Sequence, residues 1–205
     1  MTRKNLVGTA LAVLTTGLVL AGCSSGSGGG HDMGTMSSAP TTTSAMSAPS
    51  GEHNDADIAF AQGMIPHHAG AIDMSKLAQG RTSNTTVLDL ATRIEKAQDP
   101  EIELMTEWLK AWGAETSPSQ GHDAHGSSVP GMMNTDEMDK LMAAKDAEFD
   151  RLFLEGMIKH HQGAIDMAKT ELQQGGNTEA KELAQKIIDN QQAEIIEMQG
   201  LLQAG

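Results

Sequence analysis

One fifteen-residue stretch of the chain occurs twice, and most of what recurs can bind a metal ion. FAQGMIPHHAGAIDM at residues 60–74 returns as FLEGMIKHHQGAIDM at residues 153–167, with eleven identities and a constant offset of 93. Thioether sulfur and imidazole are ligands for soft and borderline metal ions, whereas a repeat kept only for packing needs little beyond apolar periodicity. The recurring methionines and histidines therefore predict a metal-binding function.

The spacing within the repeat groups its candidate ligands on one side of a helix. At about 100° per residue, Met64, His67 and Met74 share one face. Neighbouring His67 and His68 diverge by about 100°, so one ion is not easily chelated by both. We expect one imidazole to face the site and the other to make a second contact. The second copy provides the counterparts Met157, His160, His161 and Met167.

The helix that follows each copy is predicted to complete the site. Residues at equal distances from a loop lie level in a helical hairpin, so a loop near Thr82 places Gln98 beside His67. The same construction places Glu101 close to Met64. A methionine of this helix would add a thioether, and its polar residues would orient the imidazoles. The remaining residues of this set are Met105, Gln191, Glu194 and Met198.

Two aspartates of the motif point away from these ligands. Asp73 and Asp166 lie roughly opposite Met64 and Met157 on their helices. We therefore expect the two carboxylates to orient helices or ligands, and not to bind the metal themselves.

Ordinary core packing is an alternative explanation for the same residues. Methionine at helical spacing usually fills a core, and an inward histidine is usually hydrogen-bonded there. Gly70 and Gly163 can simply let two helices approach closely. Further residues of the linker could capture additional ions, although they more often belong to a plain polar segment: His122, His125, Met132 and Met133.

The first residues of the chain predict export and a lipid anchor. Residues 1–22 have a basic start and a short apolar run, which is typical of a signal peptide and too short to span a bilayer comfortably. Leu-Ala-Gly-Cys at residues 20–23 resembles a bacterial lipobox, which implies cleavage before Cys23 and lipidation of its thiol. Residues 23–53 are rich in Ser, Gly and Thr, so they are predicted to form a flexible tether.

Composition narrows the function further. The chain has fourteen methionines, no tyrosine and one cysteine, so an exported form cannot build a disulfide framework. Thioether sulfur is a soft ligand that disulfide formation does not consume. The formal charge of −13 becomes −15 once a signal peptide containing two basic residues is removed. Nucleic acid is therefore excluded as an expected partner, and cations are favoured.

The remaining periodicity predicts an all-α fold. Residues 54–205 form the expected folded part, with a first repeat at 54–113, a polar linker at 114–134 and a second repeat at 135–205. Helical periodicity begins after a capping arrangement of Asn54 and Asp57, and Gly-containing loops separate the two long helices of each repeat. Four long helices in two short-looped hairpins predict an antiparallel four-helix bundle with internal pseudo-two-fold symmetry.

The repeated motif, FxxGMIxHHxGAIDM followed by a second amphipathic helix, resembles the bacterial family called domain of unknown function 305. The resemblance covers Asp55 to Gly205 in two halves. It implies a ferritin-like helical bundle, usually exported, with some members associated with copper binding or tolerance. The positions that it marks are Met64, His67, His68, Asp73, Met74, Met157, His160, His161, Asp166 and Met167. Lys159 departs from the Pro that is usual before the histidines.

Three functions are compatible with these patterns. The leading hypothesis is a lipid-anchored, non-enzymatic protein that sequesters or delivers Cu(I), with Ag(I) as a mimic, and that loses affinity below about pH 6 as its histidines are protonated. Zinc is a further candidate, although it would give the methionines no chemical role. A metal-free envelope interaction module is the second hypothesis. A ferritin-like metalloenzyme is the third, and it is disfavoured because the sequence lacks the Glu-x-x-His of di-iron bundles.

Overall fold

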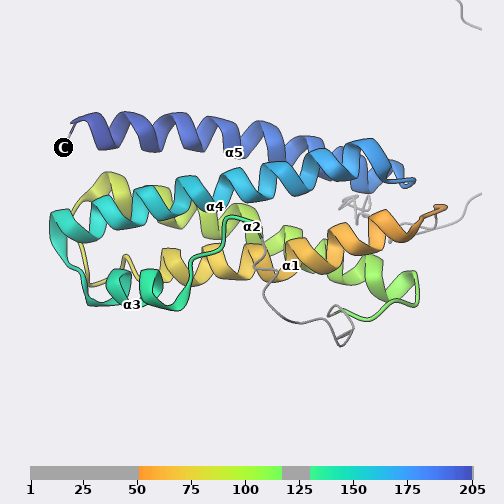
Figure 1. Cartoon of the computed structure of the whole chain (residues 1–205), viewed down its shortest axis with the longest axis horizontal. Helices are drawn as coiled ribbons and strands as arrows, with labels where there is room; N and C mark the ends of the chain where they lie inside the picture. The colour runs from red at the N-terminus through yellow and green to blue at the C-terminus, as the bar shows by residue number, and fades with distance from the viewer. Residues whose placement is uncertain (1–50, 117–129, 205) are drawn as a thin grey trace, which may run out of the picture. The chain divides into compact units, whose positions relative to one another are not determined.

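The computed structural model describes residues 51–116 and 130–204, which belong to the compact unit Ala45–Gly205. This part of the chain contains five helices and no strand, so the prediction of an all-α fold is confirmed for it (Figure 1). The helices are α1 (Asp55–Lys76), α2 (Thr85–Ala111), α3 (Thr135–Ala143), α4 (Asp146–Gln174) and α5 (Thr178–Ala204). No helix of the described part has the length and apolar character needed to cross a membrane.

The predicted signal peptide, Cys23 and most of the predicted tether lie outside the described residues, as does the middle of the linker. The other compact unit, Met1–Ser44, is therefore not described. The predicted anchor and tether stay predictions.

The start of α1 follows the capping pattern predicted from its sequence. The side chain of Asn54 accepts hydrogen bonds from the backbone N–H of Ala56 and Asp57, and the Asp57 carboxylate accepts one from the N–H of Asn54. Such a capping box satisfies donors that the first turn of a helix leaves free. Gly80 has a φ of 77° in the turn after α1, a conformation that favours glycine.

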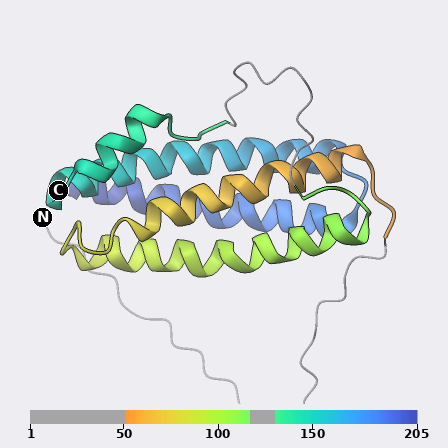
Figure 2. The ribbon, with the colours of Figure 1, turned by 90° about the horizontal axis from the view of Figure 1, so that it is seen from below.

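Helix α1 packs along α2, helix α4 packs along α5, and α1 also packs along α4. Figure 2 shows α1 between α2 and α4, with the short α3 beside the start of α4. The candidate histidine ligands of the two repeats lie on α1 and α4. Contact between these two helices therefore decides whether the two copies of the motif meet.

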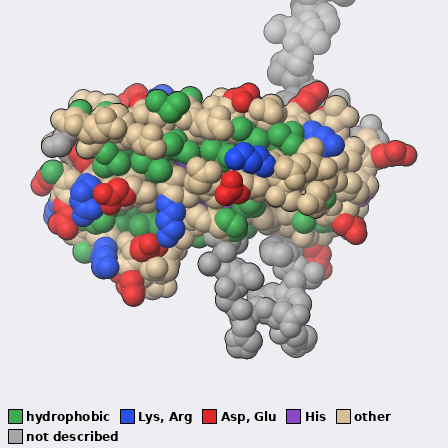
Figure 3. All heavy atoms as spheres, turned by 45° about the horizontal axis from the view of Figure 1, so that its top comes forward, with side chains coloured by type: hydrophobic (Ala, Val, Ile, Leu, Met, Phe, Trp, Pro, Cys, Tyr) green, Lys and Arg blue, Asp and Glu red, His purple; other side chains and the backbone are tan. Residues whose placement is uncertain are grey.

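Two apolar clusters form the core. The first includes Phe60, Met64, Met105, Trp108, Leu109, Ala164, Ala184 and Ile187. The second includes Ala71, Met74, Leu90, Ile94, Phe149, Phe153, Met157 and Met198. Along both α1 and α4 the cluster changes at the histidines, because Met64 and Ala71 belong to different clusters, as do Met157 and Ala164. The surface outside these clusters carries charged side chains of both signs with apolar side chains between them (Figure 3).

Candidate metal centre

His67 of α1 and His160 of α4 face each other between the two core clusters. Their ring centroids are 3.9 Å apart and the ring planes are tilted by 53°. Both residues are buried. They occupy corresponding positions of the two repeats, so the packing of α1 on α4 brings one imidazole from each repeat into a single place. The sequence predicted each histidine as a ligand but did not predict that the two would meet.

Most nitrogens of this pair have no hydrogen-bond partner among residues 51–116 and 130–204. These nitrogens are Nδ1 of His67 and both Nδ1 and Nε2 of His160, and all three are buried. The fourth nitrogen, Nε2 of His67, donates to the carbonyl oxygen of Pro130 at 3.0 Å. Since a carbonyl can only accept, the neutral ring of His67 carries its proton on Nε2 and a lone pair on Nδ1. Leaving a buried polar group unpaired costs roughly 1–3 kcal/mol, and a metal ion bound to these nitrogens would remove that cost.

Both imidazoles are neutral at physiological pH. Burial lowers the pKa of His67 to about 4, against a partial opposing effect of the hydrogen bond to Pro130. Burial also lowers the pKa of His160 to about 2, helped by the neighbouring imidazole of His67. A neutral imidazole is the form that binds metal. Burial therefore favours proton competition at a lower pH than for an unperturbed histidine, and the loss of affinity expected below about pH 6 stays a prediction.

Glycines in one helix make room for the large side chains of the other. A Cβ placed on Gly63 would lie 2.9 Å from Cε of Met167, and one on Gly156 would lie 3.2 Å from Cε of Met74. Between these two contacts, a Cβ on Gly70 would lie 3.3 Å from Nε2 of His160. Across these three contacts the residue number rises along α1 as it falls along α4, so all three fit one antiparallel alignment of the two helices. Gly63, Gly70 and Gly156 thus let α1 and α4 approach closely, which is one of the two explanations that the sequence offered for glycines of the motif. This close approach brings the two histidines together.

The second histidine of each pair contacts a carboxylate on the following helix. Nε2 of His68 is 2.9 Å from Glu101, and Nε2 of His161 is 2.6 Å from Glu194. The hairpin register places Glu101 close to Met64, and its observed hydrogen bond is to His68, one turn further along α1. The prediction that neighbouring histidines serve different contacts agrees with this geometry. The Nδ1 atoms of His68 and His161 are buried and have no partner in the part of the chain that the structure describes.

The two predicted glutamines make no hydrogen bond to the histidine pair. Gln98 and Gln191 are buried, and their side-chain oxygens have no partner in the described part of the chain. The expectation that Gln98 lies beside His67 therefore finds no supporting contact.

The aspartates of the motif are exposed. Asp166 contacts Lys169 and Gln162 at the surface, and Asp73 is likewise open to solvent. Neither carboxylate is in a position to orient the buried imidazoles, which corrects that part of the prediction. The physical reason is the helical spacing itself, which turns Asp73 and Asp166 away from the face where α1 meets α4.

The predicted methionine ligands are divided between the two core clusters. Met64 and Met105 are fully buried in the first cluster. Met74, Met157 and Met198 are buried in the second, and Met167 packs against the first. Core packing thus accounts for much of this set. Met74 and Met167 also reach across from one helix to the other, since they contact Gly156 and Gly63.

A site for a harder metal is not preformed. Within residues 51–116 and 130–204, no three His, Cys, Asp or Glu side chains lie close enough together to hold an ion. Structural zinc usually takes four such ligands. A metal ion at the histidine pair would need another kind of donor, and thioether sulfur is the donor in which this chain is rich.

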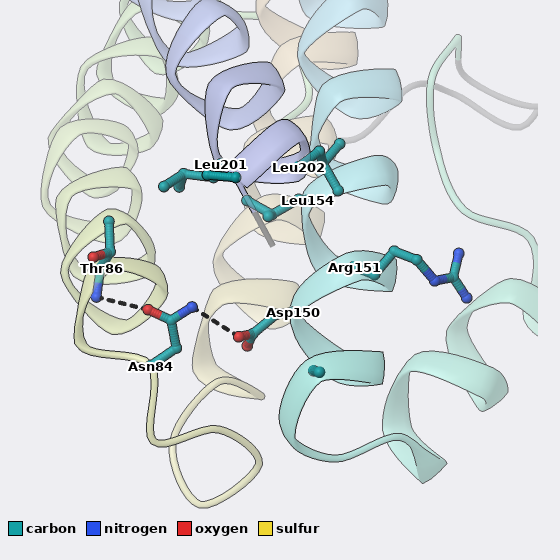
Figure 4. Close-up of a pocket in the computed structure, with 9 residues that line it drawn as sticks. Asn84, Thr86, Asp150, Arg151, Leu154, Leu201 and Leu202 are labelled. Atoms are coloured by element: carbon teal, nitrogen blue, oxygen red, sulfur yellow. Dashed lines mark hydrogen bonds between the residues drawn. The ribbon is translucent and has the colours of Figure 1, made fainter.

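The surface pocket drawn in Figure 4 is a poor alternative. It lies where α2 begins and α5 ends, and residues of α4 form its side. The side chain of Asn84 spans it, accepting from the N–H of Thr86 at 3.1 Å and donating to Asp150 at 2.9 Å (Figure 4). Its lining contains neither histidine nor methionine. The pocket therefore does not fit a soft metal ion.

The described residues thus define an all-helical protein with a buried histidine pair shared by two repeats. The chain belongs to the family described as domain of unknown function DUF305, whose model matches residues 57–202. The resemblance stated from the sequence is confirmed. None of the curated proteins compared with the chain is similar enough to count as a match.

Solved structures of this family are similar to the chain. A Streptomyces coelicolor DUF305 protein, proposed to be secreted, has 31% identity and a TM-score of 0.68, with coverage of 73% of this chain and 93% of its own. A Deinococcus radiodurans DUF305 fragment has 30% identity and a TM-score of 0.67, with coverage of 76% and 100%. CopM in its Cu(II)-bound form has 33% identity and a TM-score of 0.62, with coverage of 72% and 96%. CopM has also been solved with Cu(I) and with Ag bound.

Proposed function

We propose that this chain is an exported, lipid-anchored protein that binds Cu(I), and Ag(I) as its mimic, in order to sequester or deliver the ion. The observation that carries the proposal is the buried pair of His67 and His160, with three nitrogens that have no partner in the described part of the chain. Cu(I) suits this place because it is a soft ion that accepts neutral imidazole and thioether ligands. His67 and His160 would hold the ion, with sulfur supplied by a methionine.

The similar proteins support the proposal from another direction. CopM, at 32% identity in its Cu(I)-bound form, shows that a protein with this fold can hold copper. The Streptomyces coelicolor protein, proposed to be secreted, agrees with the export predicted for residues 1–22. The lipidation of Cys23 rests on the Leu-Ala-Gly-Cys sequence.

The architecture proposed for this function is a ferritin-like, antiparallel four-helix bundle made of two repeated hairpins. The packing of α1 on α2 and of α4 on α5 supports the two hairpins, and the packing of α1 on α4 supports their assembly. We propose a binding role and not a catalytic one, because the sequence offers no Glu-x-x-His pair. Zinc is less favoured than copper, since no group of three His, Cys, Asp or Glu side chains that could hold it occurs within residues 51–116 and 130–204.

The alternative function is a metal-free envelope interaction module, and one observation favours it. Met64, Met105, Met157 and Met198 are all fully buried among apolar side chains, as ordinary core residues are. Under this alternative the histidine pair would be a packing feature only.

Replacing both histidines by leucine tests the proposed function. The full chain, with Cys23→Ser to remove the thiol, is titrated with Cu(I) against a chromophoric chelator under reducing conditions. The His67→Leu/His160→Leu variant should bind at least ~100-fold more weakly, because both nitrogen ligands are gone. Its helicity should be retained, since leucine fills a similar volume and leaves fewer unpaired polar atoms in the core.

His53→Ala is the matched control, because His53 stacks on Trp112 at 4.8 Å, away from the pair. It should bind Cu(I) as the wild type does. Equal, weak binding by the wild type and the leucine variant would leave the envelope interaction module as the better explanation.

A further inference from the structure

The segment Pro130–Met133 crosses the contact between α1 and α4 at the histidine pair. The carbonyl oxygen of Pro130 accepts the hydrogen bond of His67. A Cβ on Gly163 would overlap that same carbonyl, so the backbone of the crossing segment rests directly on α4. Gly131 has a φ of 81°, and a Cβ there would lie 2.5 Å from the carbonyl oxygen of Lys159. Glycine at both positions is what allows this close approach.

The crossing segment brings the sulfur of Met132 next to His160. A Cβ on Gly70 would lie 3.3 Å from Sδ of Met132 and 3.3 Å from Nε2 of His160. Since both atoms lie 3.3 Å from one point, they are at most 6.6 Å apart. Metal–sulfur and metal–nitrogen bonds are about 2.3 and 2.0 Å long, and a methionine side chain is flexible enough to close the remaining distance. Gly70 has no side chain to compete for this place, and Cε of Met132 lies 3.0 Å from the same Cβ position.

Core packing does not explain Met132, although it explains its neighbour. Met133 packs against the second core cluster, and its sulfur would lie 3.2 Å from a Cβ on Gly156. Met132 belongs to neither cluster and is only partly buried. It is also unique to one half of the chain, because the residue 93 positions earlier is Ala39. At the repeat offset, the first half of the chain has no methionine in the position of Met132.

We propose that Met132 is the thioether ligand of one Cu(I) or Ag(I) site per chain, together with the imidazoles of His160 and His67. This inference rests on the proposed function and adds to it the ligand set and the stoichiometry. Because Met132 has no counterpart in the first repeat, the two copies of the motif build one high-affinity site between them and not one site each.

Met132→Leu tests this assignment, with Met133→Leu as the matched control on the adjacent residue. The probe is Ag(I), titrated into the full Cys23→Ser chain carrying ¹³C-labelled methionine methyl groups. The wild type should take up one tightly bound ion and shift the methyl resonance of Met132, which the Met132→Leu spectrum identifies. Met132→Leu should bind at least ~10-fold more weakly, because leucine keeps the volume but lacks the sulfur. Met133→Leu should stay within about twofold of the wild type.

The outcomes separate the two proposals. Equal affinity of Met132→Leu and wild type, with an unshifted Met132 methyl, would overturn the role of Met132 and leave the copper-binding function standing. Two tight ions per wild-type chain would overturn the shared site. Failure of the wild type to retain Ag(I) at all would overturn both the proposed function and this extension of it.

Discussion

Gly163→Ala is expected to detach the crossing segment from α4 and to lower the free energy of unfolding. The added Cβ would overlap the carbonyl group of Pro130 and lie 2.9 Å from the nitrogen of Gly131, and these are backbone atoms that cannot rotate away. Overpacking of this kind typically costs about 1–3 kcal/mol, against which the better helix propensity of alanine returns about 1 kcal/mol. His67 would lose its acceptor when the segment moves. Urea unfolding measures the stability, and hydrogen exchange at residues 131–133 measures the release.

Gly63→Ala is the matched control, because it makes the same change on the same face of the paired motif. There the nearest atom is Cε of Met167, at 2.9 Å. Met167 is only half-buried beside a surface hollow, so its flexible end can move. The free energy of unfolding should change by less than about 1 kcal/mol, and the crossing segment should keep its protection. Equal effects of the two substitutions would show that the crossing segment does not rest on Gly163 as described.

Glu171→Gln is expected to remove a loss of stability that the wild type suffers as the pH rises towards 8. Glu171 is buried near Asp57, whose carboxylate accepts hydrogen bonds from the backbone N–H of Asn54, Gly176 and Asn177. Burial raises the pKa of Glu171 to about 8, and so do a hydrogen bond with Asp57 and its negative charge. Within residues 51–116 and 130–204 no donor reaches the oxygens of Glu171, which agrees with a protonated carboxyl that donates to Asp57.

The direction of the pH effect follows from where the proton is held. The unfolded carboxyl of Glu171 has a pKa near 4.5, and the folded one has a pKa of about 8. Its contribution to stability is therefore full below about 4.5 and is lost as the pH rises through 8. The stability contributed by Asp57 changes with pH in the opposite direction. Burial alone would raise the pKa of Asp57, but its backbone hydrogen bonds lower that pKa overall. The contribution of Asp57 to stability is therefore lost only in acid. His67 and His160, with lowered pKa values, likewise reduce stability only as the pH falls below 6.5.

The pH range from 6.5 to 8 therefore isolates Glu171. Across it, the variant should gain about 2 kcal/mol of unfolding free energy relative to the wild type, since one pKa unit corresponds to about 1.4 kcal/mol. Urea unfolding of both proteins at several pH values measures the difference. Glu155→Gln, the same change at an exposed position of α4, should show no such trend. A constant difference between the Glu171 variant and the wild type across this range would mean that the buried carboxyl is already ionised at pH 6.5.

Local features of the molecule could be predicted from the sequence, because they depend on neighbours a few residues away. The cap of α1 by Asn54 and Asp57 needs only the spacing of two side chains. The separation of His67 from His68, and of His160 from His161, follows from about 100° per residue in any helix. The helical spacing also explains why Asp73 is exposed on the side opposite the candidate ligands. The predicted role of Asp73 in orienting those ligands did not follow from that spacing.

Contacts within a hairpin were predicted less well. The hairpin register gave Glu101 a place near the metal face of α1 but assigned it to Met64, whereas it contacts His68. A loop of a few residues can close in several ways, and each way shifts the facing helix along its axis. The sequence alone does not predict how far the facing helix is shifted along its axis.

The candidate metal centre was decided by the tertiary structure. His67 and His160 were each recognisable as candidate ligands in the sequence, but neither repeat predicts that α1 packs along α4. That packing depends on contacts between glycines of one helix and large side chains of the other. Gly63 contacts Met167 in this way, and Gly156 contacts Met74. The place of Met132 depends on a crossing segment that neither repeat contains. What the sequence determined by itself is the chemistry of the side chains and their faces on each helix, because periodicity is local. Which faces meet was decided only by packing between residues far apart in the chain, because complementary shapes exist only once both partners are folded.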